Sequence, residues 1–283
     1  MSELREQVQA HLGATYMVER ELGGGGMSRV FVAYEPTLER RVVLKVLPPE
    51  LAAGVSLERF QREIGLAARL RHANIVPLLS TGEAAGLPFY TMPFVEGESL
   101  RDRLRREVQL PVDDAVRIGC EVALALDYAH GHDIVHRDVK PENILLHEGH
   151  AVVADFGISR AITRASDVDP ITLAGMAVGT PQYMSPEQAA GEREIDGRSD
   201  IYSLGCVLYE MLAGEPPFTG RTVQAVIAKR FAGAVPSLRL VRPTVPVDVE
   251  RAVLRALAPA PEARFQTGAQ LAEALTAGVA VPS

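Results

Sequence analysis

The chain has 283 residues, of which 23% are charged, and a formal net charge of −7. It carries no long basic run, which argues against nucleic acid or an anionic membrane surface as a partner. Charged residues interrupt every apolar stretch well before the length of a bilayer span, so the sequence predicts no transmembrane helix. A chain of this length can bury one large core or two smaller ones.

Cysteine usage and the N-terminal residues predict a cytoplasmic protein. The two cysteines, Cys120 and Cys206, lie in apolar helical patterns and have no metal-binding spacing, so we expect both to be reduced and buried. No apolar signal-peptide core follows Met1.

The first predicted element is an amphipathic helix over residues 2–13. Leu4, Val8 and Leu12 recur at helical spacing, and Gly13 ends the pattern. The helix either packs on the domain that follows or forms an interface with another molecule. We favour packing.

A glycine-rich turn between two short strands is the next feature. We predict strands over residues 16–22 and 30–34, with the run Gly23 to Gly26 between them. Glycine lets a backbone approach phosphate groups closely because no Cβ intervenes. A third strand over 41–47 contains Lys45, and an apolar helical face over 57–67 carries Glu63 at its edge.

Further elements follow in the middle of the chain. Residues 89–97 predict a strand that runs into a hinge. Asp113 is a candidate N-cap for a helix that ends near Gly131. Its expected buried side is formed by Val116, Cys120, Ala123, Leu124 and Tyr128.

The stretch over residues 134–157 contains the chemistry. Two short apolar runs flank a turn at 147–150, which predicts a hairpin, and ionic and amide side chains surround it. Asp138 can accept a proton from a hydroxyl and Lys140 can neutralise a moving phosphoryl group. Asn143 and Asp155 offer the oxygen ligands that Mg²⁺ prefers.

A long segment without periodicity follows at residues 158–180. A loop of this length within a compact domain is usually functional. Its candidate phosphorylation sites are Thr172 first, then Thr163 and Ser166. Residues 200–212 are apolar almost all round and predict a buried helix, and residues 222–275 predict further helices.

Lysine is scarce in this chain, which has only Lys45, Lys140 and Lys229 among 29 basic residues. Two of the three lie in the motifs above. An ammonium contacts phosphate as a compact point charge, unlike a forked guanidinium, so a chemical requirement explains their presence.

These motifs in this order identify the chain as a protein kinase. His136-Arg137-Asp138 with Asn143 five residues beyond the Asp, followed by Asp155-Phe156-Gly157, is the signature set of that family. The chain most resembles bacterial serine/threonine kinases of the PknB type, over residues 16–275. It departs from the family pattern at Ser28, Val43 and Ser185, which replace a glycine and two alanines.

The resemblance implies an α+β, two-lobed protein kinase fold. We expect an N-terminal helical extension over 1–15, a small β-rich lobe with one main helix over 16–95, and a larger, mostly α-helical lobe over 96–283. ATP would lie between the lobes with Mg²⁺, for which Mn²⁺ can substitute.

The resemblance also assigns roles to single residues. Asp138, Lys140, Lys45 and Glu63 would be catalytic, and Asn143 and Asp155 would hold the metal. The nucleotide would contact Gly23, Gly25, Val30, Val43, Lys45, Met92, Pro93, Val95 and Leu145. Structural roles would fall to His136, Arg137, Glu187, Asp200 and Arg264, with Glu187 and Arg264 forming an ion pair.

The expected function is transfer of the γ-phosphoryl group of Mg·ATP to Ser or Thr hydroxyls of proteins, with autophosphorylation of the 158–180 loop in a homodimer. Two alternatives stay open: a nucleotide-binding regulatory module without catalysis, and a small-molecule phosphotransferase of related fold. In the family, the kinase domain often belongs to a longer membrane-anchored protein, so this chain is expected either to act alone in the cytoplasm or to be the cytoplasmic part of such a protein.

Overall fold

The computed structural model describes residues 3–25, 28–52, 55–156, 181–192, 194–232 and 234–278. These residues form two compact units, which are described separately. The first contains residues up to 71 together with 76–96, and the second contains 72–75 and the described residues from 97 onward. The sequence placed this division one residue earlier, between 95 and 96.

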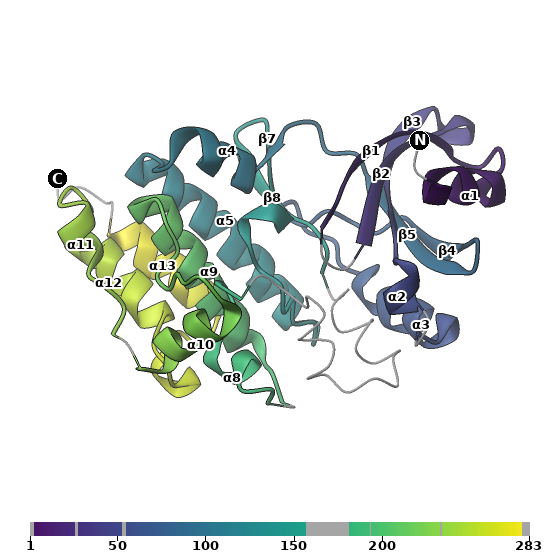
Figure 1. Ribbon diagram of the computed structural model, residues 1–283. Helices are drawn as coiled ribbons and strands as arrows, with labels where there is room; N and C mark the ends of the chain where they lie inside the picture. The colour runs from purple at the N-terminus through teal and green to yellow at the C-terminus, as the bar shows by residue number, and fades with distance from the viewer. Residues whose placement is uncertain are drawn as a thin grey trace. The chain divides into compact units, whose positions relative to one another are not determined.

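The first unit is built on an antiparallel five-stranded sheet (Figure 1). Its strands are β1 (Met17–Gly25), β2 (Ser28–Glu35), β3 (Arg40–Val46), β4 (Ser80–Ala84) and β5 (Leu87–Pro93), in the order β1-β2-β3-β5-β4. A short 3₁₀ turn, Pro36–Leu38, joins β2 to β3. The two-residue link Ala85-Gly86 has φ angles of +56° and +76°, a turn whose twist suits a tight hairpin.

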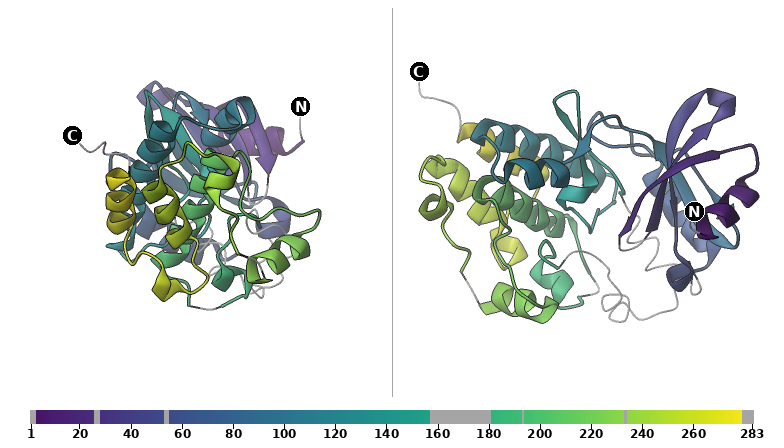
Figure 2. Two further views of the ribbon diagram at one scale, coloured as in Figure 1. Left: turned by 90° about the vertical axis from the view of Figure 1, so that its left-hand side faces the viewer. Right: turned by 45° about the horizontal axis from the view of Figure 1, so that its top comes forward.

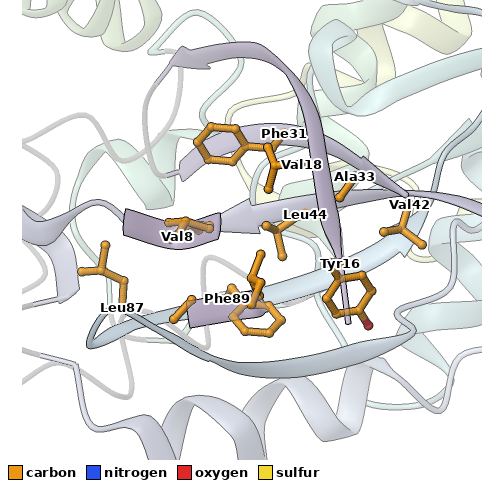
Figure 3. Close-up of a cluster of buried hydrophobic side chains, with 12 residues drawn as sticks. Val8, Tyr16, Val18, Phe31, Ala33, Val42, Leu44, Leu87 and Phe89 are labelled. Atoms are coloured by element: carbon orange, nitrogen blue, oxygen red, sulfur yellow. The ribbon is translucent and has the colours of Figure 1, made fainter. Parts of the chain in front are cut away.

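Helix α1 (Glu3–Leu12) covers one face of this sheet. Val8 and Leu12 are buried in a cluster with alternate sheet residues such as Phe31, Leu44 and Phe89 (Figure 3). Polar contacts fix the helix to the first strand: Gln9 Oε1 accepts from the Val18 amide at 2.7 Å. The preferred interpretation of residues 2–13, a helix packed on the small lobe, agrees with this contact set.

The opposite face of the sheet carries α3 (Leu57–Ala67), which a short helix α2 (Pro49–Ala52) precedes. Ser56 caps α3, since its side chain accepts from the Arg59 amide. Phe60 and Ile64 are buried against Tyr90, which neighbours Phe89 on β5 and so points to the other side of the sheet.

The second unit is mainly helical (Figure 2). Its helices are α4 (Leu100–Glu107), α5 (Val112–His130), α8 (Pro186–Ala189), α9 (Gly197–Ala213), α10 (Val223–Ala232), α11 (Leu238–Val241), α12 (Val247–Ala256) and α13 (Gly268–Ala277), with 3₁₀ turns at Pro141–Asn143 and Pro261–Ala263. Helix α9 is buried from Ser199 to Ala213 and contacts α5 and α12. The prediction of a buried helix over 200–212 is confirmed.

A small sheet in this unit presents the 134–157 stretch. It consists of β6 (Glu98–Ser99), β7 (Ile144–His147) and β8 (His150–Val153). Glu148 and Gly149 form the predicted turn, with φ angles of +48° and +84°. Residues 72–75 belong to this unit because Ile75 bridges to Val153 and Asn74 donates to the Ala151 carbonyl oxygen.

Two expectations about α5 were wrong. Pro111, not Asp113, is the N-cap, and Asp113 lies in the first turn. Leu124 is 45% exposed, whereas the buried row runs through Ala115, Ile118, Val122, Leu126 and Ala129. Because α5 is apolar over most of its circumference, periodicity alone could not select the face that packs on α9 and α13.

The cysteines are both free, but only Cys206 is buried, and Cys120 is partly exposed. Burial raises the pKa of the Cys206 thiol to about 12, which keeps it protonated. In the described ranges, every helix is too short or too polar to traverse a bilayer.

The packing of α1 gives a testable prediction. Replacing fully buried Val8 by Ala removes apolar contacts with the sheet and should lower the free energy of unfolding by about 2 kcal/mol. Urea denaturation followed by circular dichroism measures the change. Glu6→Ala on the exposed side of the same helix is the control and should shift stability far less. Equal effects would mean that α1 does not contribute through this core.

Candidate active site

Two side chains of the second unit, those of Lys140 and Asn143, donate hydrogen bonds to Asp138. Lys140 Nζ donates to Asp138 Oδ2 at 2.7 Å. Asn143 Nδ2 donates to the backbone oxygen of Asp138 at 2.8 Å and to its Oδ2 at 3.1 Å. Both side chains therefore donate to the same carboxylate oxygen, Oδ2. Within the described residues, the other oxygen, Oδ1, receives no hydrogen bond and can accept a proton.

The loop that carries Asp138 is fixed by a buried carboxylate on α9. Asp200 Oδ2 accepts from the His136 amide and from His130 Nε2, each at 2.8 Å, and Oδ1 accepts from the Arg137 amide at 2.8 Å. Asp200 is fully buried. Burial alone would raise its pKa, but the His130 hydrogen bond and the other donors outweigh burial and lower it.

Backbone strain accompanies these hydrogen bonds. Arg137 and Asp155 both have a φ of +68°, in the left-handed region that residues other than glycine rarely adopt. Each such residue costs about 1–2 kcal/mol and persists only where its surroundings impose it. For Arg137 the surroundings include Asp200 on its amide and Gln188 Nε2, which donates to its carbonyl oxygen at 2.8 Å.

His136 links this loop to the segment that carries Asp155. Its Nε2 donates to the Ala154 carbonyl oxygen at 2.9 Å, and its Nδ1 accepts from the Asp138 amide at 3.2 Å. The ring also packs edge-on against Phe156, with centroids 4.7 Å apart. The Ala154 amide donates to the Asn143 carbonyl oxygen at 2.9 Å. These contacts connect the segment that contains Asn143 to the segment that carries Asp155.

The donor set of Asn143 and Asp155 fits a magnesium ion. The Asn143 amide nitrogen donates to Asp138, so its side-chain oxygen and the Asp155 carboxylate are the candidate ligands. The described residues contain no cluster of three or more His, Cys, Asp or Glu side chains suited to a metal. Mg²⁺ needs no such cage, because it is commonly held by one or two protein oxygens with waters and phosphate oxygens.

Four of the residues predicted to contact the nucleotide share one face of the sheet in the first unit. Val30 pairs with Lys45 in register, and Val43 pairs with Met92. Directly opposed residues and alternate residues of a strand point to the same side, so all four lie on the face that carries α3. Glu63, on α3, therefore projects from the helix that covers the Lys45 face, and both side chains are half-buried.

The glycine-rich stretch differs from the expected open turn. Strand β1 continues to Gly25 and β2 starts at Ser28, with Gly23 paired to Val30 and Gly25 paired to Ser28. The predicted strand ended at Leu22, because glycine is a poor strand former and pairing across a hairpin is a tertiary property. Pro93 ends β5 and Val95 follows it, whereas Leu145 lies on β7 in the second unit.

Glu187 and Arg264 form the expected ion pair in the interior of the second unit. Arg264 Nη1 and Nη2 donate to the two Glu187 oxygens at 2.7 and 2.8 Å. Burial acts to raise the pKa of Glu187, but the hydrogen bonds from Arg264 and Ser199 lower it. Arg264 also donates to three backbone carbonyls, those of Arg198, Ala258 and Pro259, so the buried guanidinium is well satisfied.

The candidate phosphorylation sites Thr163, Ser166 and Thr172 lie outside the described residues, as does Gly157.

Comparison with known proteins identifies the family. The protein kinase domain matches residues 16–257. The chain belongs to the protein kinase family. It is 44% identical to the serine/threonine-protein kinase PknB of Mycobacterium leprae over 269 residues, which cover 92% of this chain and 42% of that protein. Identity to PknB of Mycobacterium tuberculosis (strain H37Rv) is 44%, covering 93% and 42%.

A probable serine/threonine-protein kinase of Streptomyces coelicolor is 37% identical, with 92% of this chain and 39% of that protein covered. The chain thus spans about two fifths of the length of the curated relatives it matches. The sheet-rich first unit and the helical second unit are the two parts of the kinase fold.

Two residues of this kinase domain contribute to the site although sequence analysis did not select them. His130 is the third donor to Asp200, and Gln188 holds the Arg137 carbonyl. Gln188 carried a local signal, because Ser185 and Gln188 have the spacing of a capping box, which α8 indeed forms. His130 carried none, since a histidine in the last turn of a helix is commonplace.

Asp200→Asn tests the buried carboxylate. The change leaves N–H donors facing an amide and should lower the free energy of unfolding by about 3 kcal/mol at neutral pH. Because the folded pKa is lowered, this contribution is present above the unfolded pKa of about 3.9 and is lost as pH falls through the folded value. The stability gap between wild type and variant should therefore narrow in acid.

Urea unfolding at a series of pH values measures this gap. Asp248→Asn, at an exposed carboxylate paired with Arg251, is the matched control and should cost less than about 1 kcal/mol. A gap that is small at neutral pH, or that widens in acid, would contradict the assignment.

Proposed function

We propose that this chain is an ATP-dependent serine/threonine protein kinase that transfers the γ-phosphoryl group of Mg·ATP to protein hydroxyls. The observation that carries the proposal is the Asp138 carboxylate, oriented by Lys140 and Asn143 on a loop that Asp200 fixes. Family membership and the identity of the relatives as serine/threonine-protein kinases support the same activity. The position of Lys140 two residues after Asp138 is similar to that in serine/threonine kinases rather than tyrosine kinases.

Each residue of the cluster has a proposed role in transfer. Asp138 Oδ1 accepts the proton of the attacking hydroxyl and directs the hydroxyl oxygen toward the phosphorus. Lys140 already carries its charge beside that carboxylate, so it can stabilise the negative phosphoryl oxygens as they move. Asn143 and Asp155 would hold Mg²⁺, which when bound neutralises phosphate charge.

The first unit supplies most of the proposed nucleotide contacts. Lys45 would bind phosphate oxygens and Glu63 would orient it, while Gly23 and Gly25 would bring backbone close to the phosphates. The adenine ring would contact a mainly apolar set: Val30, Val43, Met92, Pro93, Val95 and Leu145. This assignment divides the kinase domain into an N-lobe over 16–95 and a C-lobe over 96–283, with residues 1–15 as an extension.

Asp138→Asn tests the proposed base. The amide is isosteric but cannot accept the proton, so phosphoryl transfer should fall by about 10²–10⁴-fold while the fold is retained. The measurement is incorporation of radiolabelled γ-phosphate from Mg·ATP into a protein acceptor, with circular dichroism as the check on folding. Asp133→Asn is the control, at a nearby exposed aspartate in the turn after α5. A folded Asp138→Asn variant with near wild-type turnover would contradict the assignment.

The same assay separates the alternatives. A nucleotide-binding module without catalysis would give no transfer by the wild type. A small-molecule phosphotransferase would label small alcohols in preference to protein. Omitting Mg²⁺ should abolish transfer and adding it or Mn²⁺ should restore activity, which tests the metal separately from the base.

We further propose that Thr172 is the principal autophosphorylation site. Arg137 precedes Asp138 directly, and a phosphate of about −1.5 to −2 charge can order a loop against such an arginine. Protein incubated with Mg·ATP should carry phosphate on Thr172, and Thr172→Ala should lower activity toward exogenous protein more than Thr163→Ala or Ser166→Ala does. Phosphopeptide mass spectrometry and the radiolabel assay measure the two effects.

An active enzyme with unmodified Thr172, or a fully active Thr172→Ala variant, would refute this site. We also propose that autophosphorylation occurs between two copies of the chain. The initial rate per molecule should then rise with protein concentration, whereas a reaction within one molecule would give a constant rate.

A further inference from the structure

Arg230 on α10 is a buried cation that lacks a negatively charged partner among the described residues. Its side chain is only 3% exposed. Nη2 donates to the Pro181 carbonyl oxygen, but Nε and Nη1 are buried without an acceptor from the described part of the chain. A guanidinium remains charged at any physiological pH, so it cannot relieve the cost of burial by losing a proton. The site therefore favours an added acceptor, best a negative one.

Arg230 lines a pocket of about 210 Å³ in the helical unit. Of the described lining side chains, only Arg230 and Tyr202 are polar, and the others are apolar, including Phe218, Leu254 and Ala258. The guanidinium also lies over the Phe218 ring, 6.0 Å from its centroid. The pocket thus combines one cation with apolar walls.

The nearest titratable neighbours do not supply the missing negative charge. Burial raises the pKa of the Tyr202 phenol, and the nearby Arg230 charge does not reverse this. Burial likewise raises the pKa of the Cys206 thiol, and the Arg230 charge, which acts to lower it, does not reverse this. Both groups are neutral at physiological pH. Tyr202 can donate or accept a hydrogen bond, but it does not balance a charge.

We propose that this pocket binds one small carboxylate with an apolar body, its carboxylate paired with Arg230. The pocket is somewhat larger than cavities of about 150 Å³ that hold benzene, so a single substituted ring fits and a folded peptide segment does not. One guanidinium matches one monoanion, whereas a phosphate dianion would lack further donors in apolar surroundings. Apolar walls next to one ion-pairing group are typical of small-molecule sites.

The pocket adjoins the segment that leads into α8. Arg230 holds the carbonyl of Pro181 at one end of this segment, and Pro186 lines the pocket at the other. A bound carboxylate would therefore contact Arg230, which holds Pro181, and the pocket wall that Pro186 forms. The binding proposal is independent of kinase activity and can be tested without ATP.

Isothermal titration of the full chain with benzoate tests the site. Benzoate should bind saturably with one site per chain, and neutral benzamide should bind about 10-fold to 100-fold more weakly, because the charge-assisted hydrogen bonds are lost. Arg230→Met should weaken benzoate by a similar factor. Arg251→Met removes an exposed arginine on α12 and should leave the affinity unchanged.

A second variant keeps the test decisive if Arg230→Met does not fold. Ala258→Leu fills the pocket while Arg230 remains, and it should abolish benzoate binding in a protein whose circular dichroism is unchanged. The proposal is overturned if benzoate does not saturate, if a folded Arg230→Met or Ala258→Leu variant binds it as wild type does, or if benzamide binds equally well. Tighter binding of inorganic phosphate than of benzoate would also overturn the carboxylate assignment.

Discussion

The loop that carries Asp138 depends on one buried carboxylate. Asp200 accepts hydrogen bonds from His130 and from the backbone amides of His136 and Arg137, and it has no access to solvent. A buried charge is tolerated only where donors replace its water shell, and the three hydrogen bonds to Asp200 do so here and lower its pKa. In return, the amides fix the strained Arg137 backbone and so set the direction in which Asp138 leaves the loop.

Arginine forms many of the other ion pairs in the helical unit, as its abundance over lysine leads one to expect. Arg264 connects Glu187 on α8 to the Arg198 carbonyl oxygen in the first turn of α9. Arg101 on α4 reaches both Glu142 and Glu210, at 2.8 and 2.7 Å, and also Tyr183. A planar group with five donors can satisfy several acceptors at once, which a lysine cannot do in a fixed geometry. Lysine appears instead beside Asp138, where Lys140 forms an ion pair with the carboxylate.

The sheet of the first unit separates packing from chemistry by strand alternation. Phe31, Leu44 and Phe89 point to α1 and form a core, while Val43, Lys45 and Met92 occupy the opposite face. Substitutions on one face therefore act mainly on stability, and those on the other act on the proposed nucleotide contacts. Helix α1 packs on the core face of the sheet and not on the face of the proposed nucleotide contacts.

The sequence by itself determined the family and the fold class and predicted the candidate site, because kinase chemistry requires fixed residue types at short spacings. Asp138, Lys140 and Asn143 lie within six residues, so local geometry suffices to bring them together. Tertiary structure decided three features: the buried face of α5, the N-cap of α5, and the extension of β1 into the glycine run. In each case the local pattern allows more than one arrangement, and contacts with distant residues select one. The donor set of Asp200 and the contact of Arg230 with the Pro181 carbonyl also appear only in three dimensions, since they join residues 63 to 70 and 49 positions apart.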